Sequence, residues 1–362
     1  MKLTIDKDKL DAGLSSVLGL AKAKATLPVL SCVLVRADAD GLTLTTSNID
    51  ATIQRKIPAQ VDKPGAVCVP AKRFADAVRV AGADQIEVAG DDKNVLALKS
   101  GSSAFKIKGL AADEFPPMPK IQGGKSFSMM QAELARALKR TAYAQSFDKS
   151  RYVLNGVLFQ IKGKEGAITL VATDGRRLAK YDAGITTEVE GEFILPTEAC
   201  GEVARMLGDA GEVNITFTDG NAVAFAAGIT FVTKLVEGNF PNYKQVIPSE
   251  TKESVTLNRE EFIAAVQRAK IATTDRSPSV RLDLKKNSLA LSSKTEIGDA
   301  LGEISVNYKG SDMAISFNPD FALEFAQSVD DSEIKLGLIE SLSPLVFTAK
   351  DTTAVVMPMR LS

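Results

Sequence analysis

Apolar and polar positions follow the same order in three successive segments of the chain. The segments begin at Lys2, Ser126 and Ser254, and each opens with alternating apolar residues, which predicts a short strand. Apolar residues then recur three or four positions apart, which predicts an amphipathic helix. Because the starts lie about 125 residues apart, the pattern predicts three copies of one unit.

A second strand and helix pattern follows the first in each segment by about 60 to 65 residues. These later patterns begin at Val69, Leu195 and Phe317, where a proline or a polar residue precedes one more amphipathic helix. Period-two runs separated by Asp-Gly, Lys-Glu-Gly or Lys-Asn-Ser lie between the two patterns and indicate hairpins. We therefore expect an α+β fold of six β-α-β units, two in each of three tandem domains.

Two stretches rich in proline, glycine and charge separate the copies. They read FPPMPKIQGGKS and FPNYKQVIPSETKES, a composition typical of linkers between domains. The expected domains are residues 1–122, 123–250 and 251–362.

The composition excludes several classes of site. Of the 362 residues 45% are apolar and 25% are charged, and 44 Lys and Arg nearly balance 45 Asp and Glu, as in a globular protein rather than a basic tail. Histidine is absent, which removes Ser/His/Asp and Cys/His catalysis and most histidine-containing metal centres. The three cysteines show no CxxC spacing. We expect no metal and no cofactor.

The N-terminal stretch MKLTIDKDKL lacks the apolar core of a signal peptide. No apolar run approaches the roughly 18 residues that a membrane-spanning helix needs. Together with the wide spacing of the cysteines, which argues against a disulfide framework, these features predict a cytoplasmic protein without a membrane partner.

The clearest polar pattern lies on the helix predicted in the second copy. Arg136, Lys139, Arg140 and Tyr143 are spaced i, i+3, i+4 and i+7, so they share a face opposite the apolar stripe that contains Leu134. A solvated face is the simpler interpretation. A surface that neutralises phosphates is the functional one, provided that other basic helices share the same side of the assembly.

Two loops resemble catalytic or nucleotide sites only weakly. Asp174 and Gly175 form a turn-prone pair before two arginines, but no partner acid, nucleophile or metal-ligand set stands nearby, which favours a structural turn. The QGGKS stretch lacks the GxxxxGK[ST] spacing of a phosphate-binding loop.

The chain ends on the apolar run TTAVVMPMRLS, although most termini are polar and fray. The run is either the last strand of a core or a surface that a partner grips. Met357 and Met359 have flexible, polarizable side chains that suit varied ligands. The stretch with Phe240, Pro241 and Tyr243 raises the same alternative near a domain junction.

Six motifs, in order along all three copies, carry a resemblance to a known family: TLPVLS, VPAKRF, RYVLNGVLF, VATDGRRLA, KLVEGNFPNYKQVIP and VVMPMRL. With the length and the threefold repeat, they make the whole chain resemble the bacterial DNA polymerase III beta subunit family, the sliding clamps. The resemblance implies the DNA clamp fold, in which a head-to-tail homodimer closes a ring with helices inside and sheets outside.

The implied function is that of a non-catalytic processivity factor in DNA replication. The implied partners are sequence-independent double-stranded DNA, a second copy of the chain, DNA polymerase subunits, the clamp loader, and repair polymerases, ligase or mismatch-repair proteins that bind through short peptides. The near-zero net charge fits this function, because a ring is retained by topology and needs only weak phosphate contacts.

The resemblance also implies site residues, and the positive helix face adds three. The implied peptide groove comprises Leu154, Thr173, Gly175, Arg177, Leu178, Pro241, Val246, Val355, Met357, Pro358, Met359 and Arg360. The expected DNA-binding residues are Lys24, Lys72, Arg73, Arg79, Arg136, Lys139, Arg140, Arg151 and Tyr152. The expected dimer contacts are Phe105, Ile107 and Ile271. Glu198 stands where relatives tend to be basic, which predicts a weaker lining there.

Two alternatives stay open at the level of sequence. One is a nucleic-acid-processing enzyme on a duplicated scaffold, against which the absence of histidine, of a clustered carboxylate set and of a nucleotide loop counts. The other is a specialised clamp paralogue.

Overall fold

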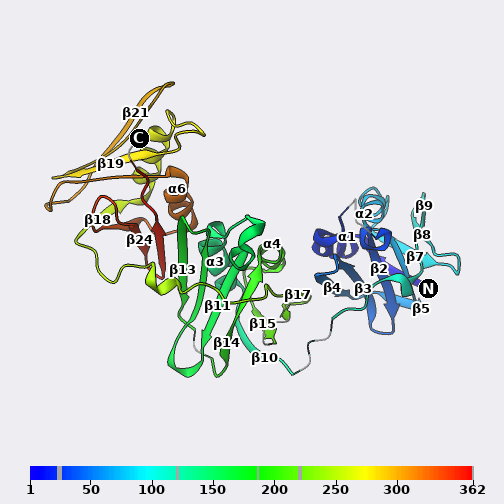
Figure 1. The fold of residues 1–362 in the computed structure, drawn as a ribbon. Helices are drawn as coiled ribbons and strands as arrows, with labels where there is room; N and C mark the ends of the chain where they lie inside the picture. The colour runs from blue at the N-terminus through cyan, green and yellow to red at the C-terminus, as the bar shows by residue number, and fades with distance from the viewer. Residues whose placement is uncertain (23–26, 120, 122, 186, 219–221, 361–362) are drawn as a thin grey trace. The chain divides into compact units, whose positions relative to one another are not determined.

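The computed structural model describes residues 1–362 apart from 23–26, 120, 122, 186, 219–221 and 361–362 (Figure 1). The chain divides into two compact units. The first consists of residues 1–132 and 201–235, and the second of residues 133–200 and 236–362.

The first unit contains one five-stranded and one eight-stranded sheet. Its helices are α1 (Lys7–Val17) and α2 (Ala71–Arg79). Its strands are β1 (Lys2–Asp6), β2 (Cys32–Asp38), β3 (Gly41–Ser47), β4 (Ala51–Ile57), β5 (Gln60–Lys63), β6 (Gly65–Pro70), β7 (Gln85–Gly90), β8 (Val95–Ser100), β9 (Ser103–Lys108), β10 (Lys125–Met130), β15 (Glu212–Phe217), β16 (Ala222–Ala226) and β17 (Ile229–Lys234).

The second unit contains one eight-stranded and one four-stranded sheet. Its helices are α5 (Arg259–Lys270) and α6 (Pro319–Ser328), while α3 (Gln131–Thr141) and α4 (Thr197–Met206) each have residues in both units. Its strands are β11 (Gly156–Lys162), β12 (Ile168–Thr173), β13 (Arg177–Ala183), β14 (Glu190–Pro196), β18 (Glu253–Asn258), β19 (Val280–Lys285), β20 (Ser288–Thr295), β21 (Gly298–Ser305), β22 (Met313–Phe317), β23 (Glu333–Leu338), β24 (Leu345–Ala349) and β25 (Thr352–Val356).

The predicted order of strands and helices is confirmed. The first pattern of each copy forms β1 and α1, β10 and α3, and β18 and α5. The second pattern forms β6 and α2, β14 and α4, and β22 and α6.

Polar residues at the ends of the strands start several of these helices. The side chain of Asp6 accepts a hydrogen bond from the backbone N–H of Lys9, and Asn258 and Asn318 cap α5 and α6 in the same way. Each such cap stabilises a helix by about 1 kcal/mol, because it satisfies a backbone donor that the helix leaves unpaired.

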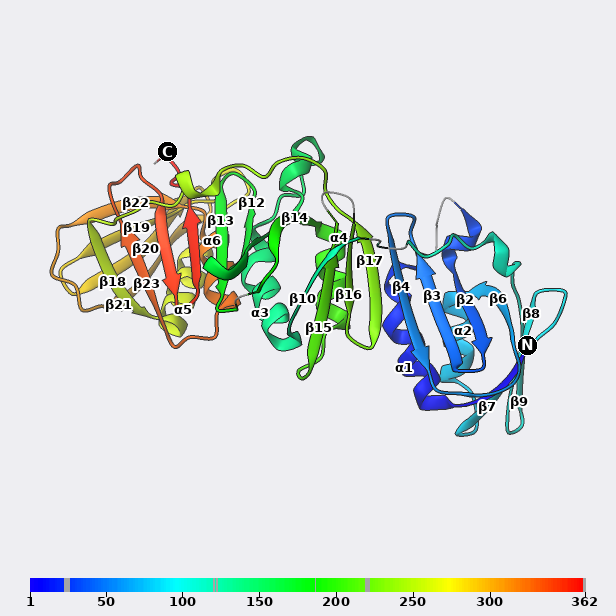
Figure 2. The ribbon, with the colours of Figure 1, turned by 90° about the horizontal axis from the view of Figure 1, so that it is seen from below.

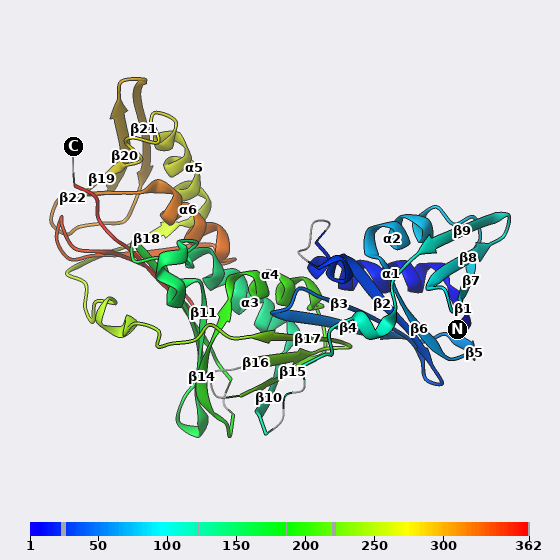
Figure 3. The same ribbon diagram turned by 45° about the vertical axis from the view of Figure 1, so that its right-hand side comes forward.

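In the second unit, α5 and α6 share one core with strands of both sheets (Figure 3). Phe347 of β24 is central to this core, since its ring centroid lies 5.7 Å from that of Phe262 on α5 and 5.5 Å from that of Phe325 on α6. The helices thus cover one face of each sheet and leave the opposite face outward.

The two eight-stranded sheets have the same topology. One runs β10-β15-β16-β17-β4-β3-β2-β6 and the other runs β18-β23-β24-β25-β13-β12-β11-β14. In both, the central antiparallel pair joins strands that are far apart in sequence, β17 with β4 and β25 with β13 (Figure 2). The apolar C-terminal run is therefore a strand as far as Val356.

The turn that precedes β4 is stabilised by its own side chains. The carboxamide of Asn48 accepts a hydrogen bond from the backbone N–H of Ala51 at 2.8 Å, and the hydroxyl of Ser47 donates to the carbonyl of Ala51 at 3.0 Å. Between them Ile49 has a φ of 81°, a left-handed conformation that is rare for a β-branched residue.

The turn that precedes β13 has the same hydrogen bonds. The carboxylate of Asp174 accepts from the backbone N–H of Arg177 at 3.0 Å, and the hydroxyl of Thr173 donates to the carbonyl of Arg177 at 2.6 Å. Here the left-handed position is Gly175, with a φ of 84°, which has no Cβ to clash. The predicted structural turn at Asp174 and Gly175 is confirmed, and the first copy contains the same turn with a strained residue.

Replacing Ile49 by glycine and, separately, by alanine tests this strain. Because a Cβ in the left-handed region costs about 1 kcal/mol, we expect Ile49→Gly to be more stable than Ile49→Ala by about that amount. Urea titrations followed by circular dichroism measure the two free energies of unfolding. Ala51→Gly is the control, since glycine in strand β4 should lower stability. An alanine variant at position 49 as stable as the glycine variant would contradict the assignment of strain.

Candidate functional site

The segment that follows β17 packs on the outward face of the large sheet of the second unit. Leu178 of β13 lies opposite Val355 of β25 in the strand register, so their side chains share that face. Tyr243, in the 3-10 turn Tyr243–Gln245, is 5% exposed, and its hydroxyl donates to Gln160 at 2.9 Å. We call this cluster the apolar surface; it comprises Leu158, Val171, Leu178, Ile194, Val236, Phe240, Tyr243, Ile247 and Val355.

Two apolar side chains next to this surface remain exposed. Val246 is 43% exposed and Met357 is 38% exposed. Backbone hydrogen bonds hold Met357 and Met359 beyond β25: the N–H of Met357 donates to the carbonyl of Arg176 at 2.9 Å, and the N–H of Met359 donates to the carbonyl of Ser316 at 2.7 Å. The C-terminal segment is thus a strand as far as Val356 and exposes an apolar side chain, Met357, directly after it.

A cavity of about 330 Å³ lies at the start of β13. We call it the arginine pocket, and its lining includes Gln145, Phe147, Arg151, Arg176, Arg177 and Phe321. Phe147 is 75% exposed at its rim. The carboxamide oxygen of Gln145 is buried and has no hydrogen-bond partner among the described residues.

Arg177 forms a wall of this pocket. Its guanidinium lies 4.5 Å from the ring centroid of Phe321 and 5.7 Å from that of Tyr143, and it pairs with Asp174 at 3.1 Å and with Glu324. Burial lowers the pKa of Arg177, and the charge of Asp174 opposes that shift. The stacked and paired guanidinium is a rigid, oriented donor.

The twelve predicted groove residues all lie in the second unit, with different degrees of exposure. Leu178 and Val355 are buried in the floor of the apolar surface, whereas Val246 and Met357 flank it in the open. The others divide between the turn before β13 (Thr173, Gly175, Arg177), the 3-10 segment Lys149–Leu154 (Leu154), and the linker and tail (Pro241, Pro358, Met359, Arg360).

The structure adds residues that sequence reasoning missed. Phe147, Asn318 and Phe321 line the arginine pocket. No local pattern marks them, since an exposed phenylalanine or a helix-capping asparagine looks the same in sequence whether or not it borders a pocket.

The predicted DNA-binding residues are only partly exposed. Lys72, Arg73 and Arg79 are exposed on α2, and Arg79 lies 3.4 Å from Asp11. Tyr152 is 59% exposed. Lys24 lies outside the described residues.

Arg151 of the same prediction is also exposed, but it borders the arginine pocket. Its Nη1 donates to the carbonyl of Asp174 at 3.2 Å. This residue therefore has a structural contact that the prediction did not include.

Arg140 is not part of an exposed positive face, so that prediction is wrong. Arg140 is 5% exposed, and its guanidinium lies 5.6 Å from the ring centroid of Tyr181. It donates to the hydroxyl of Thr352 at 3.3 Å and pairs with Asp331 at 3.4 Å. The loop after α6 covers this side of α3, so a charge at the edge of the stripe is buried and needs acidic partners.

The remaining charges of α3 are paired as well. Lys139 lies 2.8 Å from Asp330 and holds the pKa of that carboxyl below its usual range. Arg136 lies 2.6 Å from Glu133, which also accepts from the hydroxyl of Tyr181 at 2.6 Å. Burial raises the pKa of Tyr181 to about 12, so its hydroxyl stays protonated as a donor. The second copy thus presents less positive potential than the spacing predicts.

The predicted dimer contacts differ in exposure. Ile271, at the end of α5, is 76% exposed, and Ile297 of the β20–β21 turn is 63% exposed. Phe105 of β9 is partly buried. Ile107 is only 7% exposed, so within the chain it belongs to the core rather than to an open surface.

The described part of the chain holds neither a membrane-spanning helix nor a cluster of metal-ligating side chains. No helix there has the length and apolar character needed to span a bilayer. No group of three or more metal-ligating side chains comes together in the same residues.

Comparison with protein families gives matches along nearly the whole chain. The N-terminal domain of the DNA polymerase III beta subunit matches residues 1–119, its central domain matches residues 128–242, and its C-terminal domain matches residues 244–360. Curated relatives named beta sliding clamp include that of Chlamydia pneumoniae, 33% identical over 366 residues covering 100% of this chain and 99% of the relative. That of Pseudomonas aeruginosa is 32% identical over 369 residues and covers 100% of both chains.

Solved structures of sliding clamps have the same fold. The DNA polymerase sliding clamp of Bacillus subtilis is similar with a TM-score of 0.95 at 26% identity, covering 100% of both chains. The sliding clamp of Pseudomonas aeruginosa bound to griselimycin is similar with a TM-score of 0.94 at 30% identity, again over 100% of both chains.

The burial of Arg140 generates a stability prediction. Removing one partner of a buried ion pair leaves the others desolvated, so we expect Arg140→Ala to lower the free energy of unfolding by about 3 kcal/mol. Arg136→Ala, which breaks an exposed pair on the same helix, should cost less than about 1 kcal/mol. Urea titrations of both variants measure the difference. Equal small losses would show that Arg140 has no structural role.

Proposed function

The chain belongs to the bacterial DNA polymerase III beta subunit family, the sliding clamps, and on this premise we propose that two copies close head to tail into a ring around double-stranded DNA. A sliding clamp is a non-catalytic subunit that gives the polymerase its processivity. The proposal has three parts: the ring, its contact with DNA and its binding of partner peptides.

Two sheet edges support the head-to-tail contact. β9 lies at the edge of the five-stranded sheet, and β21 lies at the edge of the four-stranded sheet. An open edge strand next to exposed apolar side chains is an aggregation hazard that a specific partner strand removes. β9 carries Lys106 and Lys108, whereas β21 carries Asp299 and Glu303, so the two edges have opposite charge.

Three domains with boundaries near residues 122 and 250 remain part of the proposal. The N-terminal and central matches end at residue 119 and begin at residue 128, which supports the boundary near 122, whereas the central and C-terminal matches meet at residues 242 and 244, in the same linker but ahead of residue 250. The repeated topology of the two eight-stranded sheets supports it as well, since each sheet is completed by strands from successive copies.

The proposed contact with DNA is weak and independent of sequence. Its strongest candidates are Lys72 and Arg73, which are exposed on α2, together with Tyr152. The paired charges of α3 and a net charge of −1 favour a lining that touches phosphates lightly. Enclosure then retains the ring while it slides.

The proposed site for partner peptides is the apolar surface together with the arginine pocket. The observation that carries it is the pairing of β25 with β13, which buries Val355 and leaves Met357 exposed beside the cluster. The griselimycin complex of the Pseudomonas aeruginosa relative supports a ligand site in this family. Polymerase subunits, the clamp loader and repair proteins are the partners that we expect.

Replacing Met357, Pro358 and Met359 together by serine tests the site. Removal of these three apolar side chains should weaken griselimycin binding at least about tenfold, which is a loss of 1.4 kcal/mol or more in binding free energy. Isothermal titration calorimetry measures it.

Met130→Ser is the matched control, because that methionine is 49% exposed on β10 and outside the proposed site. Sedimentation should show a dimer for both variants and for the parent chain. Unchanged griselimycin affinity in the triple variant would refute the peptide site, and a parent chain that sediments as a monomer would refute the ring.

A further inference from the structure

A second cavity, of about 430 Å³, lies on the small sheet β21-β20-β19-β22 of the second unit. Its lining includes Arg281 of β19, Ser292 of β20 and Leu301 of β21. The residues that alternate with these, such as Leu282 and Leu291, are fully buried against the core that contains α5 and α6. The cavity therefore opens on the outward face of the sheet.

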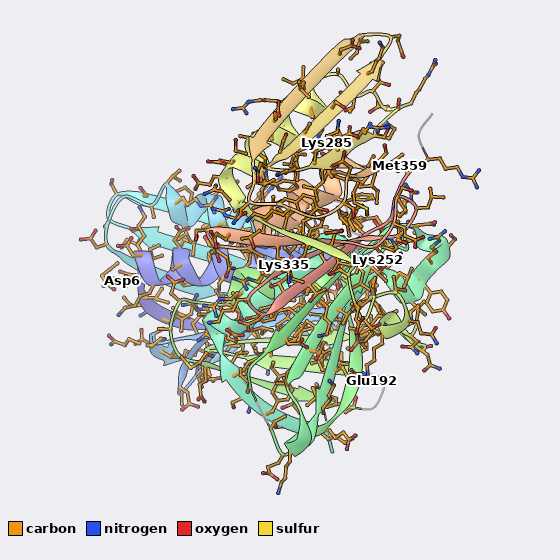
Figure 4. All side chains as sticks on the ribbon, turned by 90° about the vertical axis from the view of Figure 1, so that its left-hand side faces the viewer. Asp6, Glu192, Lys252, Lys285, Lys335 and Met359 are labelled. Carbon is orange, nitrogen blue, oxygen red and sulfur yellow. The ribbon has the colours of Figure 1, made fainter. Side chains whose placement is uncertain are left out.

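The strand register connects this cavity to the C-terminal tail. Leu301 lies opposite Ser292, Ser292 opposite Arg281, and Arg281 opposite Ser316. An isolated bridge then pairs Ser316 with Met359. Because directly opposed residues of antiparallel strands project to the same face, these five side chains form one row. Figure 4 shows Met359 beside the strands of this sheet.

The row sets the distance from the proposed peptide site to the cavity. Neighbouring strands lie about 4.8 Å apart, so Arg281, two strands from the tail, is about 10 Å from Met359 along the row. An extended peptide covers this distance with about three residues.

Arginine, lysine and serine side chains line the cavity together with one carboxylate, that of Asp299. Asp283 accepts from Nε and Nη2 of Arg281, both at 2.8 Å, which fixes the guanidinium and leaves Nη1 outside that pair. Lys294 at the rim has a side chain that is 85% exposed and lies 3.8 Å from Asp299. Serines line the rest, at positions 277, 279, 292 and 316, whereas the hydroxyl of the neighbouring Ser293 is used within the core, where it donates to the carbonyl of Ala269. Donors of this kind favour a carboxylate, which accepts several hydrogen bonds at once.

We infer that this cavity binds an acidic residue of a partner peptide, about three residues beyond the apolar segment that covers Met357 and Met359. The inference rests on the proposed peptide site and adds a determinant of partner choice to it. The apolar surface takes apolar side chains of the peptide, and the cavity discriminates among peptides by the charge that flanks them.

Synthetic peptides that compete with labelled griselimycin on the full-length protein test the inference. The core probe is acetyl-Ala-Leu-Ala-Leu-Phe-amide. Four longer probes add Gly-Gly-Glu or Gly-Gly-Gln after the phenylalanine, or Glu-Gly-Gly or Gln-Gly-Gly before the first alanine. In one of the two positions, after the phenylalanine or before the first alanine, the peptide with glutamate should bind about tenfold tighter than the otherwise identical peptide with glutamine.

Single substitutions show whether the preference for glutamate arises in the cavity. Arg281→Gln should abolish the preference for glutamate and leave the affinity for the core probe within about twofold. Ser292→Leu, which fills the centre of the row without removing a charge, should do the same and keeps the test available if Arg281→Gln weakens the sheet. Lys285→Gln is the control, because it removes one positive charge from the same strand at an exposed position outside the cavity lining.

The outcomes separate this inference from the proposed function. Equal affinities of the glutamate and glutamine peptides at both ends overturn the inference alone. A preference that Lys285→Gln abolishes, or that both cavity variants retain, overturns it as well. Failure of every peptide and of griselimycin to bind overturns the peptide site itself.

Discussion

The structure depends on antiparallel pairing between strands that are far apart in the chain. β13 pairs with β25 and β4 pairs with β17, and each pairing completes an eight-stranded sheet from two shorter halves. Without these hydrogen bonds, each half of the sheet would end in an open edge strand with unpaired backbone N–H and C=O groups. The apolar C-terminal run is held in place by this pairing as far as Val356, and the exposed Met357 borders the proposed partner site.

The two faces of the β13–β25 pair have different chemistry. On the face towards the helices, Arg140 contacts Tyr181 and Thr352, which lie opposite each other in the register. A buried charge with fixed partners disfavours a slipped register, because a shift of one residue would leave it unpaired. On the outward face, Leu178 and Val355 form the apolar floor. One strand pair therefore supplies both the alignment of the sheet and the ligand surface.

Local pattern predicted the elements, because strand alternation and helical periodicity report on burial within a few residues. It did not predict that the tail pairs with β13, or that Arg140 meets Asp331 from a loop almost two hundred positions later. The groove residues were indicated by resemblance to a family and not by spacing. Neither the local pattern nor the family resemblance indicated Phe147 and Phe321, since only the folded chain brings them to the arginine pocket. Ile49 shows the reverse case, a turn that persists without the glycine that would have marked it.

In the proposed function, the closed ring stays on DNA because it encircles the duplex and not because it binds the phosphates tightly. The near-neutral net charge of the chain fits this proposal. The most direct measurement is the lifetime of the loaded protein on a nicked circular plasmid before and after the plasmid is cut by a restriction enzyme, at constant salt. The account predicts a long lifetime on the circle and rapid loss from the ends once the DNA is linear. Equal lifetimes on circular and linear DNA would contradict it.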